Sequence, residues 1–173
     1  MVGLGTLNPA ILVRIQAPEQ SNFNDIVFMP IMYEFRDMTD TEYKREQAAF
    51  NEHGLEFGNP SEKQERFGFV ATEDGKFVGA SSGLAHKNNG NHEPYFYLSD
   101  LLVEKAHRKH GYGKKLLGLL EDKVKSLGIK YIWTWTAEYE AETFYIKHGY
   151  EVFTKFDNYY QSGHSRVGLI KKL

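Results

Sequence analysis

The order of apolar and polar positions along the chain predicts short strands separated by helices. Residues 31–35 alternate between apolar and polar types, which predicts a first strand. Thr39 or Asp40 can then cap a helix that ends near His53. The chain therefore changes from a two-residue to a helical period early in its length.

The first 28 residues show no sustained period and carry turn formers at both ends. We interpret residues 1–28 as an N-terminal extension outside the core, with a strand expected at Ala10–Ile15. Residues 29–173 are then expected to form a single domain, a size that is ordinary for one hydrophobic core.

The middle of the chain predicts a hairpin followed by a central strand. Residues 66–72 and 76–86 are two β-rich runs around an Asp-Gly turn. A second turn is expected at 88–94. Residues 95–103 form a strongly apolar run, long enough for a strand that is buried on both faces.

An amphipathic helix is expected before Gly128. Leu116, Leu120 and Val124 recur at a spacing of four, while lysines and acids fill the opposite face. Gly128 suits the position just after the last helical turn, where left-handed backbone is common.

The C-terminal third predicts strand, helix, strand, strand. The expected strands are 130–136, 151–156 and 165–173, and a short helix within 140–150 ends at Gly149. The whole order, β α β β β α β α β β, implies an α/β domain around one mixed sheet.

Composition removes several classes of function. The net charge of −2 gives no reason to expect a nucleic-acid partner. The chain has no cysteine, so disulfides, thiolate metal sites and a cysteinyl acyl intermediate are excluded. No apolar run is long enough for a membrane span and the N-terminus lacks a signal-peptide pattern, so we predict a cytoplasmic protein.

Charge is distributed unevenly. Between Glu34 and Glu65 there are nine acids against four bases, whereas between Glu104 and Lys130 there are eight bases against three acids. These segments are either two solvated helix faces or the cation-binding and anion-binding halves of one site.

A turn rich in glycine and basic residues precedes the amphipathic helix. In "RKHGYG", residues 108–113, Gly111 and Gly113 leave backbone N–H groups accessible at the positive end of the helix dipole. Arg108, Lys109 and Lys114 add positive charge. The spacing fits neither a Walker loop nor a dinucleotide fingerprint. The turn is either an anion site or a flexible loop with solvated lysines.

A second motif, "AETFYIKHGY" at residues 141–150, gives a helix with an apolar flank and one phenol, Tyr145. Taken alone, Tyr145 is either a core aromatic residue with its hydroxyl at the surface or a functional group.

Together the two motifs resemble the pyrophosphate turn and the Ala-x-x-Phe-Tyr helix of the GNAT N-acetyltransferases, over about Met32 to Leu173. The ending "GHSRVGLIKKL" is similar to small bacterial GNAT proteins whose acceptors are unassigned. The resemblance implies a mostly antiparallel sheet with splayed central strands, acetyl-CoA as cosubstrate, and in many relatives a homodimer. The residues that it implies for CoA binding are Leu102, Val103, Arg108, Lys109, His110, Gly111, Tyr112, Gly113 and Lys114.

The implied reaction is direct transfer of an acetyl group to the primary amine of a small molecule or peptide. Tyr145, with an ordinary pKa of ~10, holds the position of the group that serves the departing thiolate. A lysine-like amine has a pKa of ~10.4, so a carboxylate should take its proton directly or through water, and Asp100 and Glu138 are the two candidates. Each acid is otherwise a helix cap or a solvated loop residue.

Three further questions stay open in the sequence. The acidic segment from Glu34 to Glu65 favours a cationic acceptor as a hypothesis. A domain that binds acyl-CoA as a sensor or scaffold without turnover is the alternative function. His107 and His110 lie three residues apart without a third nearby ligand, so no metal site is predicted.

Overall fold

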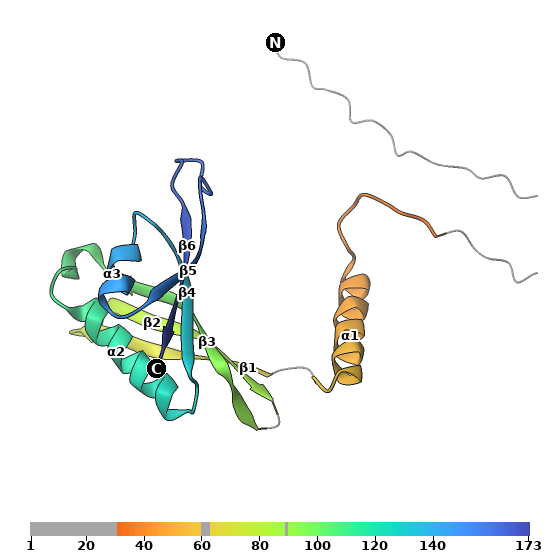
Figure 1. Ribbon diagram of the computed structural model, residues 1–173, viewed down its shortest axis with the longest axis horizontal. Helices are drawn as coiled ribbons and strands as arrows, with labels where there is room; N and C mark the ends of the chain where they lie inside the picture. Colours follow the sequence, from red (N-terminus) through yellow and green to blue (C-terminus); the bar gives the residue numbers. More distant parts are fainter. Residues whose placement is uncertain (1–30, 60–62, 89) are drawn as a thin grey trace, which may run out of the picture. The chain divides into compact units, whose positions relative to one another are not determined.

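The computed structural model describes residues 31–59, 63–88 and 90–173. The helices and strands follow the order that Figure 1 labels. They are α1 (Asp40–Glu56), β1 (Lys63–Glu73), β2 (Lys76–Asn88), β3 (Asn91–Val103), the 3-10 turn η1 (Lys105–His107), α2 (Tyr112–Ser126), β4 (Tyr131–Ala137), α3 (Glu142–Lys147), β5 (Glu151–Phe156) and β6 (Arg166–Lys172).

The strands form one six-stranded sheet in the order β1-β2-β3-β4-β6-β5. β3 and β4 pair in parallel, and every other neighbouring pair is antiparallel. The parallel pair needs a crossover connection, which η1 and α2 provide. The prediction of an α/β domain with a mixed, mostly antiparallel sheet flanked by helices is confirmed.

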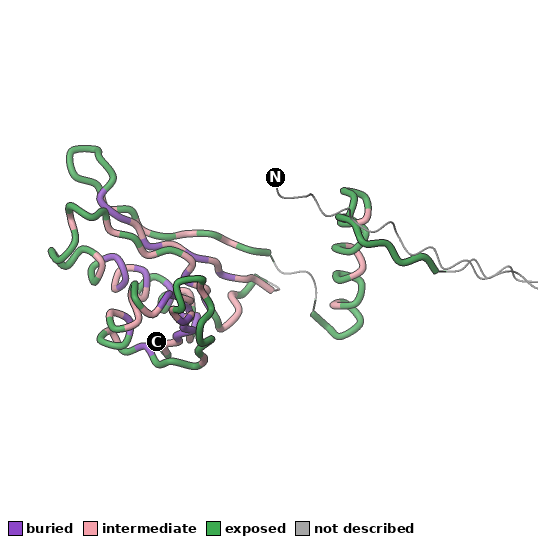
Figure 2. The backbone as a smooth tube through the Cα atoms, turned by 90° about the horizontal axis from the view of Figure 1, so that it is seen from above, coloured by how far each residue is buried: buried purple, intermediate pink, exposed green. Residues whose placement is uncertain are grey.

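The core lies between the sheet and the two helices that follow its central strands. Leu117, Leu120 and Val124 of α2 pack against Phe96 and Leu98 of β3. Buried positions accordingly lie on β2, β3, β4 and β6 and on one side of α2, among the segments drawn in purple in Figure 2. The predicted spacing of four residues therefore marks the buried face of α2, and Gly128 adopts the expected left-handed backbone with φ of 81°.

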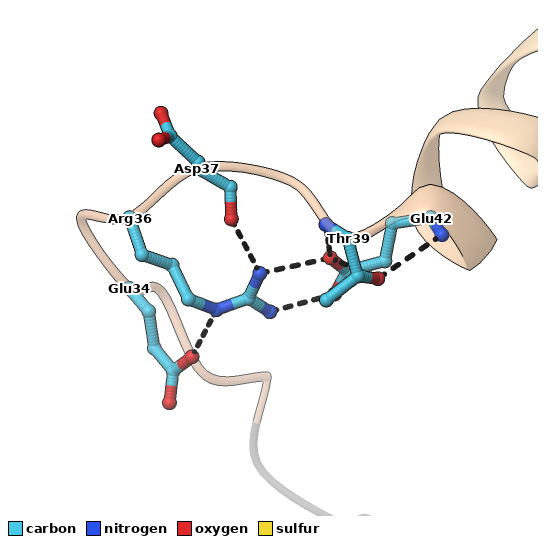
Figure 3. A network of polar contacts seen from close by, with 5 residues as sticks. All are labelled: Glu34, Arg36, Asp37, Thr39 and Glu42. Carbon is cyan, nitrogen blue, oxygen red and sulfur yellow. Dashed lines mark hydrogen bonds and ion pairs between the residues drawn. The ribbon is translucent and has the colours of Figure 1, made fainter.

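Helix α1 begins with a capping box. The Glu42 backbone N–H donates to Thr39 Oγ1 at 3.3 Å, and the Thr39 N–H donates back to Glu42 Oε2 at 2.7 Å. Arg36 donates to both carboxylate oxygens of Glu42 and to Glu34 (Figure 3). These hydrogen bonds hold the pKa of Glu42 far below its usual range. Thr39 is thus the cap that the sequence left open between two residues.

The predicted strand at 31–35 is wrong: this segment has no regular structure, and all strands of the described chain follow residue 62. Alternation alone does not form a strand, because the backbone N–H and C=O groups also need a partner strand. The predicted turn at 88–94 is shorter than expected, since Asn88 already pairs with Asn91.

Two predictions concern residues outside the described ranges. These are the strand at Ala10–Ile15 and the boundary between an extension at 1–28 and a domain at 29–173. Both stay predictions.

Candidate active site

The central strands separate at their C-terminal ends. β3 and β4 pair only from Tyr95 with Tyr131 to Leu98 with Thr134. At the last pair the Thr134 hydroxyl donates to the Leu98 carbonyl at 2.8 Å. Beyond this point β3 continues along β2 and β4 along β6, so a gap opens between them. The splayed central strands expected from the family resemblance are present.

A β-bulge marks the point of divergence. The register of β2 with β3 shifts between Ser82 and Gly83, which leaves Ser99 as the extra residue opposite them. A bulge bends its strand and re-aims the side chains that follow. Asp100 fixes this bend, because it accepts hydrogen bonds from the hydroxyls of Ser82 and Ser99 at 2.9 and 2.8 Å and binds Arg66.

The gap is a cleft of about 850 Å³, which we call the β3–β4 cleft. Its size suits a substrate or cofactor site. Its walls come from the end of β3, the loop before α2, the end of β4 and the start of α3. The lining residues are Ser99, Leu101, Leu102, Val103, His107, Arg108, Lys109, Gly111, Tyr112, Gly113, Lys114, Thr134, Trp135, Thr136, Tyr139, Glu140, Ala141, Phe144 and Tyr145.

One end of the cleft is formed by the glycine turn. Gly111 has a φ of 83° and begins α2 without a side-chain cap, so the first N–H groups of the helix are free to bind an anion. Gly113 follows within the first turn of α2. A Cβ at Gly113 would lie 3.7 Å from Val103 and 3.8 Å from Phe144, which both line the cleft. The missing side chains therefore leave the floor of this end open.

Basic side chains surround the same turn. Arg108, Lys109 and Lys114 all line the cleft. Lys109 has a φ of 67°, a strained conformation for a residue with a side chain. Arg108 donates from Nε to the Val103 carbonyl at 3.0 Å, which ties the turn to the end of β3. The turn thus combines fixed backbone donors with positive charge, as an anion site requires.

The wall of the cleft at the start of α3, which we call the α3 end, includes Tyr145, which is only 4% exposed. Burial raises the pKa of Tyr145 to about 12; the Thr134 hydroxyl acts in the opposite direction and the negative charge of Glu140 adds to the rise. The phenol therefore stays protonated at neutral pH. It can donate a hydrogen bond into the cleft.

The two acids expected as bases lie elsewhere. Asp100 and Glu138 are not among the lining residues. The hydroxyls of Ser99 and Ser82 and the charge of Arg66 lower the pKa of Asp100. Glu138 pairs with Lys155 at 2.9 Å, and hydrogen bonds from Ser165 and Lys155 lower its pKa to about 2.

Nine of the residues expected to bind CoA or serve the thiolate meet in the cleft, namely Leu102, Val103, Arg108, Lys109, Gly111, Tyr112, Gly113, Lys114 and Tyr145. His110 belongs to the same turn but its side chain is exposed outside the lining.

Reasoning from sequence missed Glu140, Thr134 and Tyr139, which also line the cleft. Glu140 and Tyr139 could have been suspected from the sequence, because they lie just before the start of α3. Thr134 carried none, because its role depends on where two strands separate.

The residues described contain no group of three His, Cys, Asp or Glu side chains that could hold a metal ion. No helix within those same ranges is long and apolar enough to cross a bilayer.

Comparisons with known proteins agree with this geometry. A family model described as the acetyltransferase (GNAT) family matches residues 30–150. No curated protein matches the chain.

Among solved structures, an acetyltransferase from Bacillus cereus is similar at 22% identity with a TM-score of 0.69, covering 82% of this chain and 98% of that one. A protein from Agrobacterium tumefaciens assigned to the acetyltransferases has 19% identity and a TM-score of 0.66, covering 83% and 100%. An aminoglycoside 6′-N-acetyltransferase complexed with coenzyme A has 23% identity and a TM-score of 0.52, covering 70% and 78%. At these identities the likeness concerns the fold.

Proposed function

This chain belongs to the GNAT acetyltransferase family, and we propose that it transfers an acetyl group from acetyl-CoA to a primary amine by direct attack while both substrates are bound. The observation that carries this proposal is the β3–β4 cleft, which an uncapped glycine turn and a buried, protonated phenol both line.

The glycine turn would bind the pyrophosphate of CoA. The N–H groups at the start of α2 have no side-chain cap, and Arg108, Lys109 and Lys114 supply opposite charge for a dianion. The pantetheine arm would extend along the unpaired end of β3. There Leu102 and Val103 line the cleft, on the edge of β3 that β4 leaves unpaired.

Tyr145 would assist departure of the CoA thiolate. An ordinary thiol has a pKa of ~8.5, so this phenol, with a pKa of about 12, is the weaker acid. Its contribution is therefore a hydrogen bond to the sulfur as negative charge develops there, and the final proton comes from solvent. A hydrogen bond that strengthens only in the transition state accelerates the chemical step.

Direct attack suits the lining of the cleft. The chain has no cysteine to form an acyl intermediate. The lining residues include hydroxyls, aromatic rings, one carboxylate and several cations. An amine that enters such a cleft can reach the thioester without an intervening enzyme nucleophile.

The acceptor is proposed to be cationic in its resting form. Part of the acidic segment is already neutralised, because Glu34 and Glu42 bind Arg36 while Glu65 binds Lys87 and His92. The negative charge inside the cleft is that of Glu140. This favours an amine of modest positive charge over a polycation.

The test is thioester consumption with a panel of primary amines, namely an alkylamine, a polyamine, an aminoglycoside and a lysine-containing peptide. We expect acetyl-CoA to be consumed with at least one of them, and CoA binding to be measurable by calorimetry. Tight CoA binding without consumption by any amine would favour the alternative, a domain that senses or holds acyl-CoA. The panel also includes an amine that carries carboxylates and a weakly basic amine that is neutral at pH 7. Rates with these two that equal those of the cationic amines would contradict a cationic acceptor.

A further inference from the structure

We propose that Glu140 is the base that takes the proton from the attacking amine. This inference rests on the proposed function and assigns to Glu140 the role for which the sequence offered Asp100 and Glu138.

Glu140 is placed by the connection between β4 and α3. Its backbone N–H donates to the Ala137 carbonyl at 2.9 Å, which forms a tight turn directly after the last paired residue of β4. This turn sets Glu140 into the wall of the cleft beside Tyr139 and Ala141. The hydrogen bond across this turn limits the backbone conformations open to Glu140.

Glu140 differs in charge from the other residues that line the cleft. It is the one carboxylate among the described residues that line the cleft. Within the described ranges its side chain accepts one weak hydrogen bond, from the Ala137 N–H to Oε2 at 3.5 Å, and forms no ion pair with a lysine or arginine. By contrast, Asp100 and Glu138 each hold a cation, Arg66 and Lys155. An acid that already neutralises a fixed cation is a weaker base than one that does not.

The position relative to Tyr145 also fits. The negative charge of Glu140 helps to raise the pKa of Tyr145, so the two side chains are close enough to interact electrostatically. Acid and base roles are commonly divided between two neighbouring titratable groups whose surroundings favour opposite protonation states. Here the phenol is buried and stays protonated, while the Glu140 carboxylate is exposed to solvent.

The one histidine of the lining lies beside the glycine turn. His107 is in η1, its Nε2 lies 3.4 Å from Glu73, and its ring centre is 6.5 Å from that of Tyr112. It therefore belongs to the glycine turn, where the pyrophosphate is expected. Apart from this imidazole, the Glu140 carboxylate is the one ordinary base in the described lining, and its charge acts on Tyr145.

The step balances as follows. The ammonium form of the acceptor first loses one proton to solvent. The neutral amine nitrogen then bonds to the thioester carbonyl carbon, and the nitrogen becomes acidic as this bond forms. Glu140 takes one proton from it, directly or through a water molecule. The carbon–sulfur bond then breaks, its electron pair leaves with sulfur, and Tyr145 donates a hydrogen bond to the thiolate. Glu140 passes its proton to solvent, and the products are the acetylated amine and CoA.

Glu140→Gln keeps the size of the side chain and removes the base. With the best amine of the panel, we expect kcat/KM near pH 7 to fall by about 100-fold, in the usual range for loss of a general base. The loss should shrink toward pH 10, where hydroxide can take the proton instead, so log(kcat/KM) should rise more steeply with pH than in the unmodified protein. Glu140→Ala should regain activity with added formate, because a small carboxylate can occupy the vacated space.

Glu142→Gln is the matched control. It removes the same charge two residues away, in the first turn of α3 and outside the cleft lining. We expect its pH profile to equal that of the unmodified protein. CoA affinity should be unchanged in every one of these variants.

Two results would overturn the assignment. One is a Glu140→Gln profile parallel to that of the active unmodified protein, with no formate rescue of Glu140→Ala. The other is a steeper rise of log(kcat/KM) with pH in Asp100→Asn or Glu138→Gln, together with an unchanged pH profile in Glu140→Gln. If the unmodified protein acetylates no amine of the panel, the proposed function itself fails, and the assignment fails with it. This outcome is distinguishable from the two above, because both of those require an active unmodified protein.

Discussion

The two ends of the β3–β4 cleft use different parts of the chain. At the glycine turn the groups that face the cleft are backbone N–H groups, made accessible by a left-handed Gly111 and an uncapped helix. At the α3 end the groups that face the cleft are side chains, the buried phenol of Tyr145 and the exposed carboxylate of Glu140. The first end is exposed and basic, and the second is partly buried and carries the negative charge.

The difference determines how each end can be damaged. A backbone site is disturbed by adding a Cβ or by changing φ, whereas exchange of a neighbouring side chain should matter less. A side-chain site is disturbed by removing a single polar atom, even when shape is kept. Substitutions that respect this division should separate binding from chemistry.

The largest effect is expected for Tyr145→Phe. Loss of the hydroxyl removes the hydrogen bond to the leaving thiolate, and we expect turnover to fall by about 100-fold or more. CoA affinity from calorimetry should change by less than about threefold, because the glycine turn is intact. Since the pKa of Tyr145 is raised to about 12, the unmodified protein should show no loss of turnover from this group below about pH 11. An unchanged turnover number in Tyr145→Phe would contradict its role.

The next effect is expected for Gly111→Val. A β-branched residue resists the φ of 83°, so the turn should relax and its N–H groups should move off the anion. We expect CoA affinity to fall by about 10- to 100-fold, the equivalent of losing one charge-assisted hydrogen bond.

Gly75→Val is the matched control for Gly111→Val. Gly75 has a φ of 76° in the turn between β1 and β2. At both glycines, the Cβ of a substituted residue would have no other atom within 4 Å. Both variants should lose about 1–3 kcal/mol of unfolding free energy from the same strain. Only Gly111→Val should weaken CoA binding, and equal affinities in the two variants would show that the turn does not hold the pyrophosphate.

The smallest effect is expected for Gly113→Ala. Its Cβ would meet only ordinary contacts and alanine favours a helix, so unfolding free energy should rise by up to about 1 kcal/mol. CoA affinity should nevertheless fall about threefold to tenfold, because the methyl group enters the floor of the cleft. Gly118→Ala in the same helix has open space around its Cβ and should give the stability gain alone. Urea denaturation and calorimetry separate the two quantities.

Much of the fold could be predicted because local patterns report burial. The leucines of α2 and the apolar run of β3 mark surfaces that must leave water, and Gly128 and Gly149 mark helix ends where φ is positive. The segment 31–35 shows the limit of this reasoning. Its alternation matches a strand, yet strand formation also needs a neighbouring backbone, which a local pattern does not specify.

The glycine turn was determined by the sequence alone. Its chemistry is that of the backbone, so Gly111, Gly113 and the start of an amphipathic helix suffice to place accessible N–H groups beside positive charge. The tertiary structure decided which of three carboxylates hold a cation and which one lines the cleft. Asp100, Glu138 and Glu140 look alike in the sequence, but the fold brings Arg66 to the first and Lys155 to the second, and turns the third into the cleft. The physical reason is that the basicity of an acid depends on charges brought close from distant strands.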